Sequence, residues 1–246
     1  MLVTQEFTIK VQDEIILDNI NLEFGPGIHI VMGPNGVGKS TFAHALMGNP
    51  VYQTEGAAQL NGKDLLSMET FERAEAGLFL GFQTPTPIEG LSNFQLINQV
   101  LNKQENYSLI DNLNKFKELS NNFNLPDKWD KKQLNVEASG GEKKKNELIQ
   151  MELLDPEVVI LDEPDSGLDI DAIQTLITFL NDFSQRPNKT IIIISHYAQL
   201  IKALNVQSVA ILGKTKVKQG DIELAYDVLD NGCLLYTSDA ADDRMR

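Results

Sequence analysis

Short apolar runs separated by polar segments recur along the chain, and their lengths are those of buried strands. The runs lie at residues 28–32 (IHIVM), 78–82 (LFLGF), 158–161 (VVIL) and 191–194 (IIII). Aliphatic runs of this kind, without strict alternation, are typical of strands covered on both faces in a parallel sheet. Residues 2–10 and 14–24 meet at a Gln-Asp-Glu turn, and we expect them to form an antiparallel β part.

Residues 85–153 have a different pattern, rich in Asn, Lys and Leu. Apolar residues recur there at helical spacing, for example in Phe94, Ile97 and Leu101. This pattern predicts a helical subdomain over 85–153, inserted between core segments 1–84 and 154–232. The chain of 246 residues is long enough to bury a sizeable core. We therefore expect one α/β domain over residues 1–232.

A glycine-rich segment after the first buried run fits a G-x-x-x-x-G-K-S phosphate loop at every position. Its residues are Gly33, Pro34, Asn35, Gly36, Val37, Gly38, Lys39, Ser40 and Thr41. The glycines let successive N–H groups face the phosphates of a nucleotide, Lys39 adds a positive charge, and the Ser40 hydroxyl can bind Mg²⁺. A plain glycine-rich turn is the alternative, and the fit of every position and of both flanks disfavours it.

Two adjacent carboxylates, Asp162 and Glu163, follow the apolar run at 158–161. Strands of open α/β sheets present their functional groups at their carboxyl ends. We expect Asp162 to hold Mg²⁺, directly or through water, and Glu163 to polarise a water that attacks the γ-phosphate. Two acids that merely end a strand before Pro164 are the alternative, which the upstream phosphate loop makes the weaker one.

The order of the motifs resembles that of ATP-binding cassette (ABC) ATPases over about residues 1–230. The motifs are the phosphate loop, Gln83 after an apolar run, Ser139-Gly140-Gly141, Asp162-Glu163, the loop that ends in Asp169, and His196 after the run at 191–194. The resemblance implies an ABC ATPase nucleotide-binding domain with a P-loop core sheet, an antiparallel β part and an inserted helical subdomain. It also implies hydrolysis of ATP with Mg²⁺.

The resemblance further implies a head-to-tail dimer that forms transiently when ATP binds. ATP on one subunit's phosphate loop would be closed over by the signature residues of the other, which are Ser139, Gly140, Gly141 and Glu142. Gln83 would contact Mg²⁺ together with Ser40 and Asp162, and would couple the γ-phosphate to the helical subdomain. His196 would contact the γ-phosphate beside the catalytic Glu163, and Asp169 would communicate across the dimer.

Two positions separate this chain from typical transporter ATPases. Glu142 stands where those proteins have Gln, and Asp165 stands where they have Thr. With the neighbouring stretches, this pattern resembles the SufC subfamily, the ATPases of the SUF iron–sulfur cluster assembly machine. That resemblance implies a cytoplasmic protein that binds SufB- and SufD-like scaffold proteins in place of transmembrane domains. The surface from Gln83 to Leu101 is the docking surface we expect for the scaffold.

Two other function classes remain open: the ATP-binding subunit of an ABC membrane transporter, and an ABC protein that acts on ribosomes or DNA. A formal charge of −14 argues against nucleic acid or anionic lipid as a bulk electrostatic partner. No apolar run approaches the roughly twenty residues of a membrane span. Met1 leads directly into an alternating segment, so we expect no signal peptide and no direct membrane insertion.

Three consecutive lysines, Lys143, Lys144 and Lys145, follow the signature turn. A solvated helical face is the simplest interpretation of such a run. Because this helix has to pack near the strand that ends in Asp162, we also consider a specific hypothesis for Lys144. It would pair with Glu163 in the resting monomer and mask the catalytic base.

We interpret residues 233–246 as a non-native, adapter-derived tail. Residues 233–242, CLLYTSDAAD, can be back-translated as TGT CTC TTA TAC ACA TCT GAC GCT GCC GAC, which resembles the transposase adapter of sequencing libraries. An ordinary polar tail is the alternative. Since the only cysteine, Cys233, lies in this segment, we expect neither a disulfide framework nor a cysteine-ligated cluster on this chain.

Overall fold

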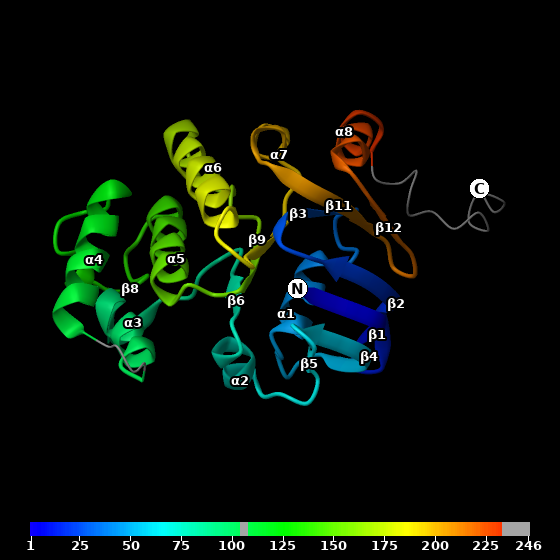
Figure 1. Ribbon diagram of the computed structural model, residues 1–246, viewed down its shortest axis with the longest axis horizontal. Coiled ribbons are helices and arrows are strands. Elements are labelled where there is room, and N and C mark those ends of the chain that lie inside the picture. The colour runs from blue at the N-terminus through cyan, green and yellow to red at the C-terminus, as the bar shows by residue number, and fades with distance from the viewer. Residues whose placement is uncertain (104–107, 233–246) are drawn as a thin grey trace.

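The computed structural model describes residues 1–103 and 108–232 (Figure 1). Cys233 and the adapter interpretation lie outside the described residues. The larger sheet has the strand order β12-β11-β3-β10-β9-β6, in which every pair is parallel except β11 and β12. Its strands are β3 (Gly27–Met32), β6 (Leu78–Gly81), β9 (Val158–Asp162), β10 (Thr190–Ile194), β11 (Val206–Leu212) and β12 (Val217–Gly220).

The apolar runs form the centre of this sheet because both of its faces are covered. Along β10, Ile191 and Ile193 pack into one hydrophobic cluster, whereas Ile192 and Ile194 pack into the other. Every residue of β9 and β10 is buried. The first cluster contains side chains of the helices on one face, and the second contains the antiparallel strands and α1 (Lys39–Leu46).

A second sheet, with the order β2-β1-β4-β5, is antiparallel throughout. Its strands are β1 (Leu2–Val11), β2 (Glu14–Phe24), β4 (Gln53–Leu60) and β5 (Lys63–Asp64). Gln12 and Asp13 turn between β1 and β2 with φ of 47° and 68°. The sequence did not predict β4 and β5. Phe42 of α1 packs edge-on against Phe7 of β1 with ring centroids 6.1 Å apart, which ties the phosphate-loop helix to this sheet.

Helices α3 (Asn93–Leu101), α4 (Leu109–Asn122) and α5 (Gly140–Leu154) gather at the opposite end of the molecule from the antiparallel sheet (Figure 1). The short pair β7 (Ile88–Ser92) and β8 (Gln133–Leu134) and the 3₁₀ turn Trp129–Lys131 lie among them. The remaining helices are α2 (Thr70–Glu75), α6 (Ile170–Ser184), α7 (Ala198–Ala203) and α8 (Ile222–Asn231). The parallel P-loop sheet, the antiparallel strands and the helices confirm the predicted fold class.

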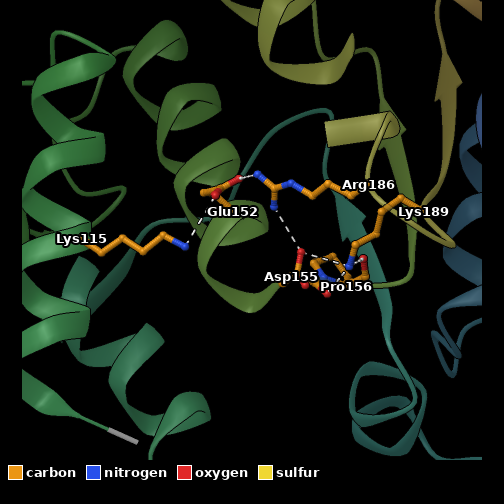
Figure 2. A network of polar contacts seen from close by, with 6 residues as sticks. All are labelled: Lys115, Glu152, Asp155, Pro156, Arg186 and Lys189. Carbon is orange, nitrogen blue, oxygen red and sulfur yellow. Dashed lines mark hydrogen bonds and ion pairs between the residues drawn. The ribbon is translucent and has the colours of Figure 1, made fainter. Parts of the chain in front are cut away.

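A polar network joins this group of helices to the sheet (Figure 2). Glu152 near the end of α5 pairs with Lys115 of α4 at 3.6 Å and with Arg186, just after α6, at 2.7 Å. Arg186 also pairs with Asp155 at 3.2 Å. Lys189 donates hydrogen bonds to the carbonyl oxygens of Asp155 and Pro156 ahead of β9. The network therefore fixes where α5 ends relative to the strand that carries Asp162 and Glu163.

Across residues 1–103 and 108–232, no helix is both long enough and apolar enough to cross a membrane.

Candidate nucleotide site

The phosphate loop connects β3 to α1, and two of its glycines have no substitute. Gly33 has φ of 155°, and a Cβ there would lie 2.4 Å from the carbonyl oxygen of Leu212. Gly38 precedes α1 with φ of 111°, and a Cβ there would lie 3.0 Å from Cγ2 of Ile16. Residues of β11 and β2 therefore leave no room for a side chain at these two positions, and both φ angles favour glycine. Asn35 and Gly36, at its tip, are exposed.

Lys39 curls back under this loop. Its Nζ donates hydrogen bonds to the carbonyl oxygens of Gly33 at 2.9 Å and Pro34 at 3.0 Å, and the residue is 7% exposed. These bonds hold a positive charge against the loop that a phosphate would meet. Ser40 and Thr41 follow in the first turn of α1, where the positive end of the helix adds to the same field.

Asp162 ends β9 and is almost completely buried, with 1% of its surface exposed. Neither of its carboxylate oxygens has a hydrogen-bond partner of accepted geometry. Burial raises the pKa of Asp162, and the nearby Ser40 hydroxyl is the main group that opposes this rise. A buried carboxylate without partners is costly unless another group, such as a cation, satisfies it.

Ser40 and Asp162 therefore fit a Mg²⁺ ion. The described residues contain no cluster of three or more His, Cys, Asp and Glu side chains suited to a metal. This agrees with Mg²⁺ rather than excluding it, because Mg²⁺ bound to a nucleotide takes one or two protein ligands and completes its shell with phosphates and waters.

Glu163 follows Asp162 in a left-handed backbone conformation, with φ of 45°. Its N–H donates to the carbonyl oxygen of Ile194 at 2.9 Å, and its own carbonyl accepts from the N–H of Ser166 at 3.1 Å. A non-glycine residue in this region costs on the order of 1 kcal/mol, so these bonds must hold it there. The left-handed conformation ends the extended backbone of β9 at Asp162.

The side chains of Gln83 and Glu163 meet directly. Gln83 Nε2 donates to Glu163 Oε2 at 2.5 Å, although 80 positions separate the two residues. Nothing in the sequence pattern predicted this hydrogen bond, because it depends on how β6 and β9 pair in the sheet. The Mg²⁺ role predicted for Gln83 rests on its amide oxygen, which this bond does not use.

His196 lies beside the same groups. Its Nε2 atom is buried and has no hydrogen-bond partner. Burial, and secondarily the charge of Lys39, lowers the pKa of His196, while Glu163 and Asp165 oppose the shift. The imidazole is therefore held in its neutral form, and it lies close enough to Lys39 and Glu163 for both charges to act on it.

The signature residues lie in a different part of the molecule. Ser139 caps α5 by accepting from the N–H of Glu142 at 3.2 Å, and Glu142 accepts from the N–H of Ser139 at 2.7 Å. This reciprocal capping explains the acid at position 142 without any contact to a nucleotide. Figure 1 places α5 with α3 and α4, apart from α1 and its phosphate loop. Asp169 is likewise a helix cap, accepting from the N–H of Ala172 at 2.8 Å.

The hypothesis that Lys144 masks Glu163 is wrong. Lys144 Nζ donates to the carbonyl oxygen of Phe82, reaches that of Asp162 at 3.4 Å, and pairs with Glu147 at 3.6 Å. Lys144 is buried and its ammonium group is bound by these three groups. The Glu163 carboxylate instead accepts a hydrogen bond from Gln83. A run of three lysines gave no sign of this, because the sequence does not show that Lys144 and Glu147 are both buried.

Comparison with known proteins gives consistent findings. A family model described as ABC transporter matches residues 17–166. Vegetative protein 296 of Bacillus subtilis (strain 168) is 38% identical over 231 residues, which cover 91% of this chain and 88% of that protein. The probable ATP-dependent transporter SufC of Escherichia coli (strain K12) is 36% identical over 241 residues, covering 94% and 97%.

Among solved structures, a dimeric bacterial ABC transporter cassette superposes with a TM-score of 0.77 at 18% identity. The match covers 90% of this chain and 99% of the cassette. At this level of identity, the likeness shows a shared fold.

Proposed function

Because the chain belongs to the ABC transporter family of ATPases, we propose that it drives iron–sulfur cluster assembly as the SufC-like subunit of a complex with SufB- and SufD-like scaffold proteins. The observation that carries the ATPase chemistry is the pair at the end of β9. Asp162 is buried near the Ser40 hydroxyl with neither carboxylate oxygen in a hydrogen bond of accepted geometry, and Glu163 follows in a left-handed backbone conformation. One group suits a cation and the next suits a water.

Hydrolysis follows from this arrangement. Water attacks the γ-phosphorus in line, the bond to the bridging oxygen breaks, and ADP leaves with the electron pair. Glu163 orients the water and takes its proton, while Lys39 and the loop N–H groups stabilise the charge on the phosphoryl oxygens. Neutral His196 donates to a γ-phosphate oxygen. Mg²⁺ held by Ser40 and Asp162 would neutralise phosphate charge.

The signature turn acts on a second copy of the chain. Ser139 and Gly140 are exposed at the start of α5, which lies away from the phosphate loop of its own chain (Figure 1). An N-terminal helix turn with free N–H groups suits a phosphate. In a head-to-tail dimer, the turn of one subunit would close over the nucleotide of the other. The similar cassette described as dimeric supports the formation of a dimer.

The scaffold-binding surface lies over the Gln83–Leu101 segment. Phe82, Ile88 and Val100 leave 42%, 45% and 46% of their surfaces exposed. Phe71 of α2 is 62% exposed, and α2 packs next to β6, the strand that leads into Phe82. Exposed large apolar side chains of this kind are common at interaction surfaces. The 36% identity to a protein named SufC favours a scaffold over a permease as the partner.

Two measurements test the proposal. Glu163→Gln should bind ATP at the parent affinity but hydrolyse it at least about 100-fold more slowly, because the water loses its base. Hydrolysis at the parent rate by this variant would remove Glu163 from its role. Co-expression of the tagged chain with SufB- and SufD-like proteins should yield a complex that Ile88→Asp weakens, whereas Ile15→Asp, on β2, leaves it intact. Co-purification with a membrane permease instead would support the transporter alternative.

A further inference from the structure

Glu147 is a charged side chain buried inside α5, two turns after the signature residues. It is 7% exposed and pairs with Lys144, which is 6% exposed. A buried ion pair of this kind adds little stability over well-packed apolar residues, because both charges lose their hydration. Removing one member alone is destabilising, because the other charge is left unpaired. The contacts of the pair show what it does in this fold.

The pair holds both sides of one residue's backbone. Glu147 Oε1 accepts from the N–H of Phe82 at 2.8 Å. Lys144 Nζ donates to the carbonyl oxygen of the same Phe82. Phe82 is the residue that precedes Gln83, at the point where β6 ends. Lys144 and Glu147, one turn apart on α5, therefore fix the two peptide groups of Phe82 that precede Gln83. We call this pair of contacts the clamp.

One further contact ties this clamp to the strand that leads into Glu163, and the packing beside it is tight. Lys144 Nζ also reaches the carbonyl oxygen of Asp162 at 3.4 Å, immediately before Glu163. Packing beside β6 is tight, since a Cβ at Gly81 would lie 2.7 Å from Leu161 Cδ2 and the Leu161 side chain would have to shift. The backbones ahead of Gln83 and Glu163 are thus held by the same helix. The side chains of Gln83 and Glu163 then meet, with Nε2 and Oε2 2.5 Å apart.

We propose that Glu147 is a positioning residue for hydrolysis: through Lys144 and the Phe82 backbone it makes the placement of Gln83 against Glu163 depend on the position of α5. The same helix begins with the signature turn at Ser139. If α5 shifts when the signature turn binds a nucleotide, these contacts change the position of Gln83 relative to Glu163. This role rests on the proposed function of those two residues.

Three variants separate positioning from plain stability. Glu147→Met removes the Phe82 acceptor and leaves Lys144 unpaired, so it should lower both stability and kcat. The double variant Lys144→Met with Glu147→Met removes the unpaired charge and should recover stability. It still lacks the clamp, so kcat should stay about 10-fold or more below the parent while KM for ATP changes less than about twofold. Glu147→Gln keeps an acceptor for the Phe82 N–H and should retain more of kcat than Glu147→Met.

The measurements are steady-state ATP hydrolysis by the full chain, urea unfolding, and hydrogen exchange of the peptide that contains Phe82. Exchange there should accelerate in the double variant. Recovery of kcat to within about twofold of the parent in the stable double variant would overturn the proposal, because a structural role alone predicts that recovery. Gln150→Ala, at a partly exposed position of the same helix outside both the clamp and the Glu152 network, should leave kcat and KM unchanged. Failure of the proposed function would appear separately, as full activity of Glu163→Gln.

Discussion

Ser195 donates a hydrogen bond from its hydroxyl to Oδ1 of Asp165 at 2.7 Å. The same hydroxyl accepts from the N–H of Tyr197 at 3.0 Å, and Ser195 is fully buried. The bond joins the loop that follows Glu163 to the residues on either side of His196. Asp165, which the sequence set apart only as a departure from transporter ATPases, therefore has a structural task beside the hydrolytic groups.

Replacing Asp165 tests this task. Asp165→Ala leaves the buried Ser195 hydroxyl without its acceptor, so we expect a loss of about 1 kcal/mol in unfolding free energy. Because His196 follows Ser195, kcat should also fall, by about fivefold to tenfold. Asp165→Asn keeps an acceptor oxygen and should retain most of both quantities. Equal kcat values for the Ala variant and the parent would show that this bond does not position His196.

The phosphate loop gives a second prediction. Gly33→Ala would place a Cβ 2.4 Å from the Leu212 carbonyl oxygen, a contact between two backbone segments that cannot relax easily. We expect loss of ATP binding and destabilisation of at least about 2 kcal/mol. The matched control is Gly62→Ala, which has φ of 80° but open space around it. It should cost about 1 kcal/mol of strain and leave the Kd for ATP unchanged, as titration with a fluorescent ATP analogue would report.

The sequence predicted the elements whose residues follow a local pattern of apolar and turn-forming positions. The apolar runs at 158–161 and 191–194 became buried strands, and the turn at Gln12-Asp13 lies where it was predicted. Contacts that depend on strand order could not be read in this way. The bond from Gln83 to Glu163 exists because β6 and β9 are neighbours, and the left-handed backbone of Glu163 has no signature in residue type.

The partner of Lys144 likewise could not be predicted from the sequence. Its distance along the chain allowed a partner on β9, and the helix does bring it there, but to a backbone carbonyl. The choice between the carbonyl of Asp162 and the carboxylate of Glu163 depends on side-chain direction. Lys144 forms its buried ion pair with Glu147, one turn further along α5, and not with Glu163.

His196 should make stability depend on pH in the acidic direction. Burial lowers its pKa below the ordinary value of 6.5, so the unfolded chain binds a proton more readily than the folded chain. The stability contributed by the neutral imidazole is complete above that value and is lost as pH falls below it. We expect His196→Gln to lose less stability than the parent between about pH 7.5 and pH 5.5, measured by urea unfolding. Parallel curves for the two proteins would contradict this.

Glu147 should act with the opposite sign. Burial raises its pKa from an ordinary value of 4.5 to about 7, although Lys144 and the Phe82 N–H oppose the shift. Between these values the folded chain holds the proton more tightly than the unfolded chain. Stability is therefore greatest below the ordinary value and declines as pH rises toward about 7. Glu147→Gln should remove this decline, and a decline of undiminished size in that variant would exclude Glu147 as its source.

The network at the end of α5 supports a last prediction, on stability alone. Glu152 is 12% exposed and is shared between Lys115 and Arg186 (Figure 2). Because the pairing is partly screened by solvent at both cations, Glu152→Gln should cost about 1 kcal/mol of unfolding free energy. The control is Glu55→Gln, which breaks the pair with Lys10 where Glu55 is 64% exposed. That loss should stay below about 0.5 kcal/mol, because an exposed pair gains little over its hydrated state. Equal losses in urea unfolding would mean that Glu152 does not join α5 to the sheet more firmly than an ordinary surface pair does.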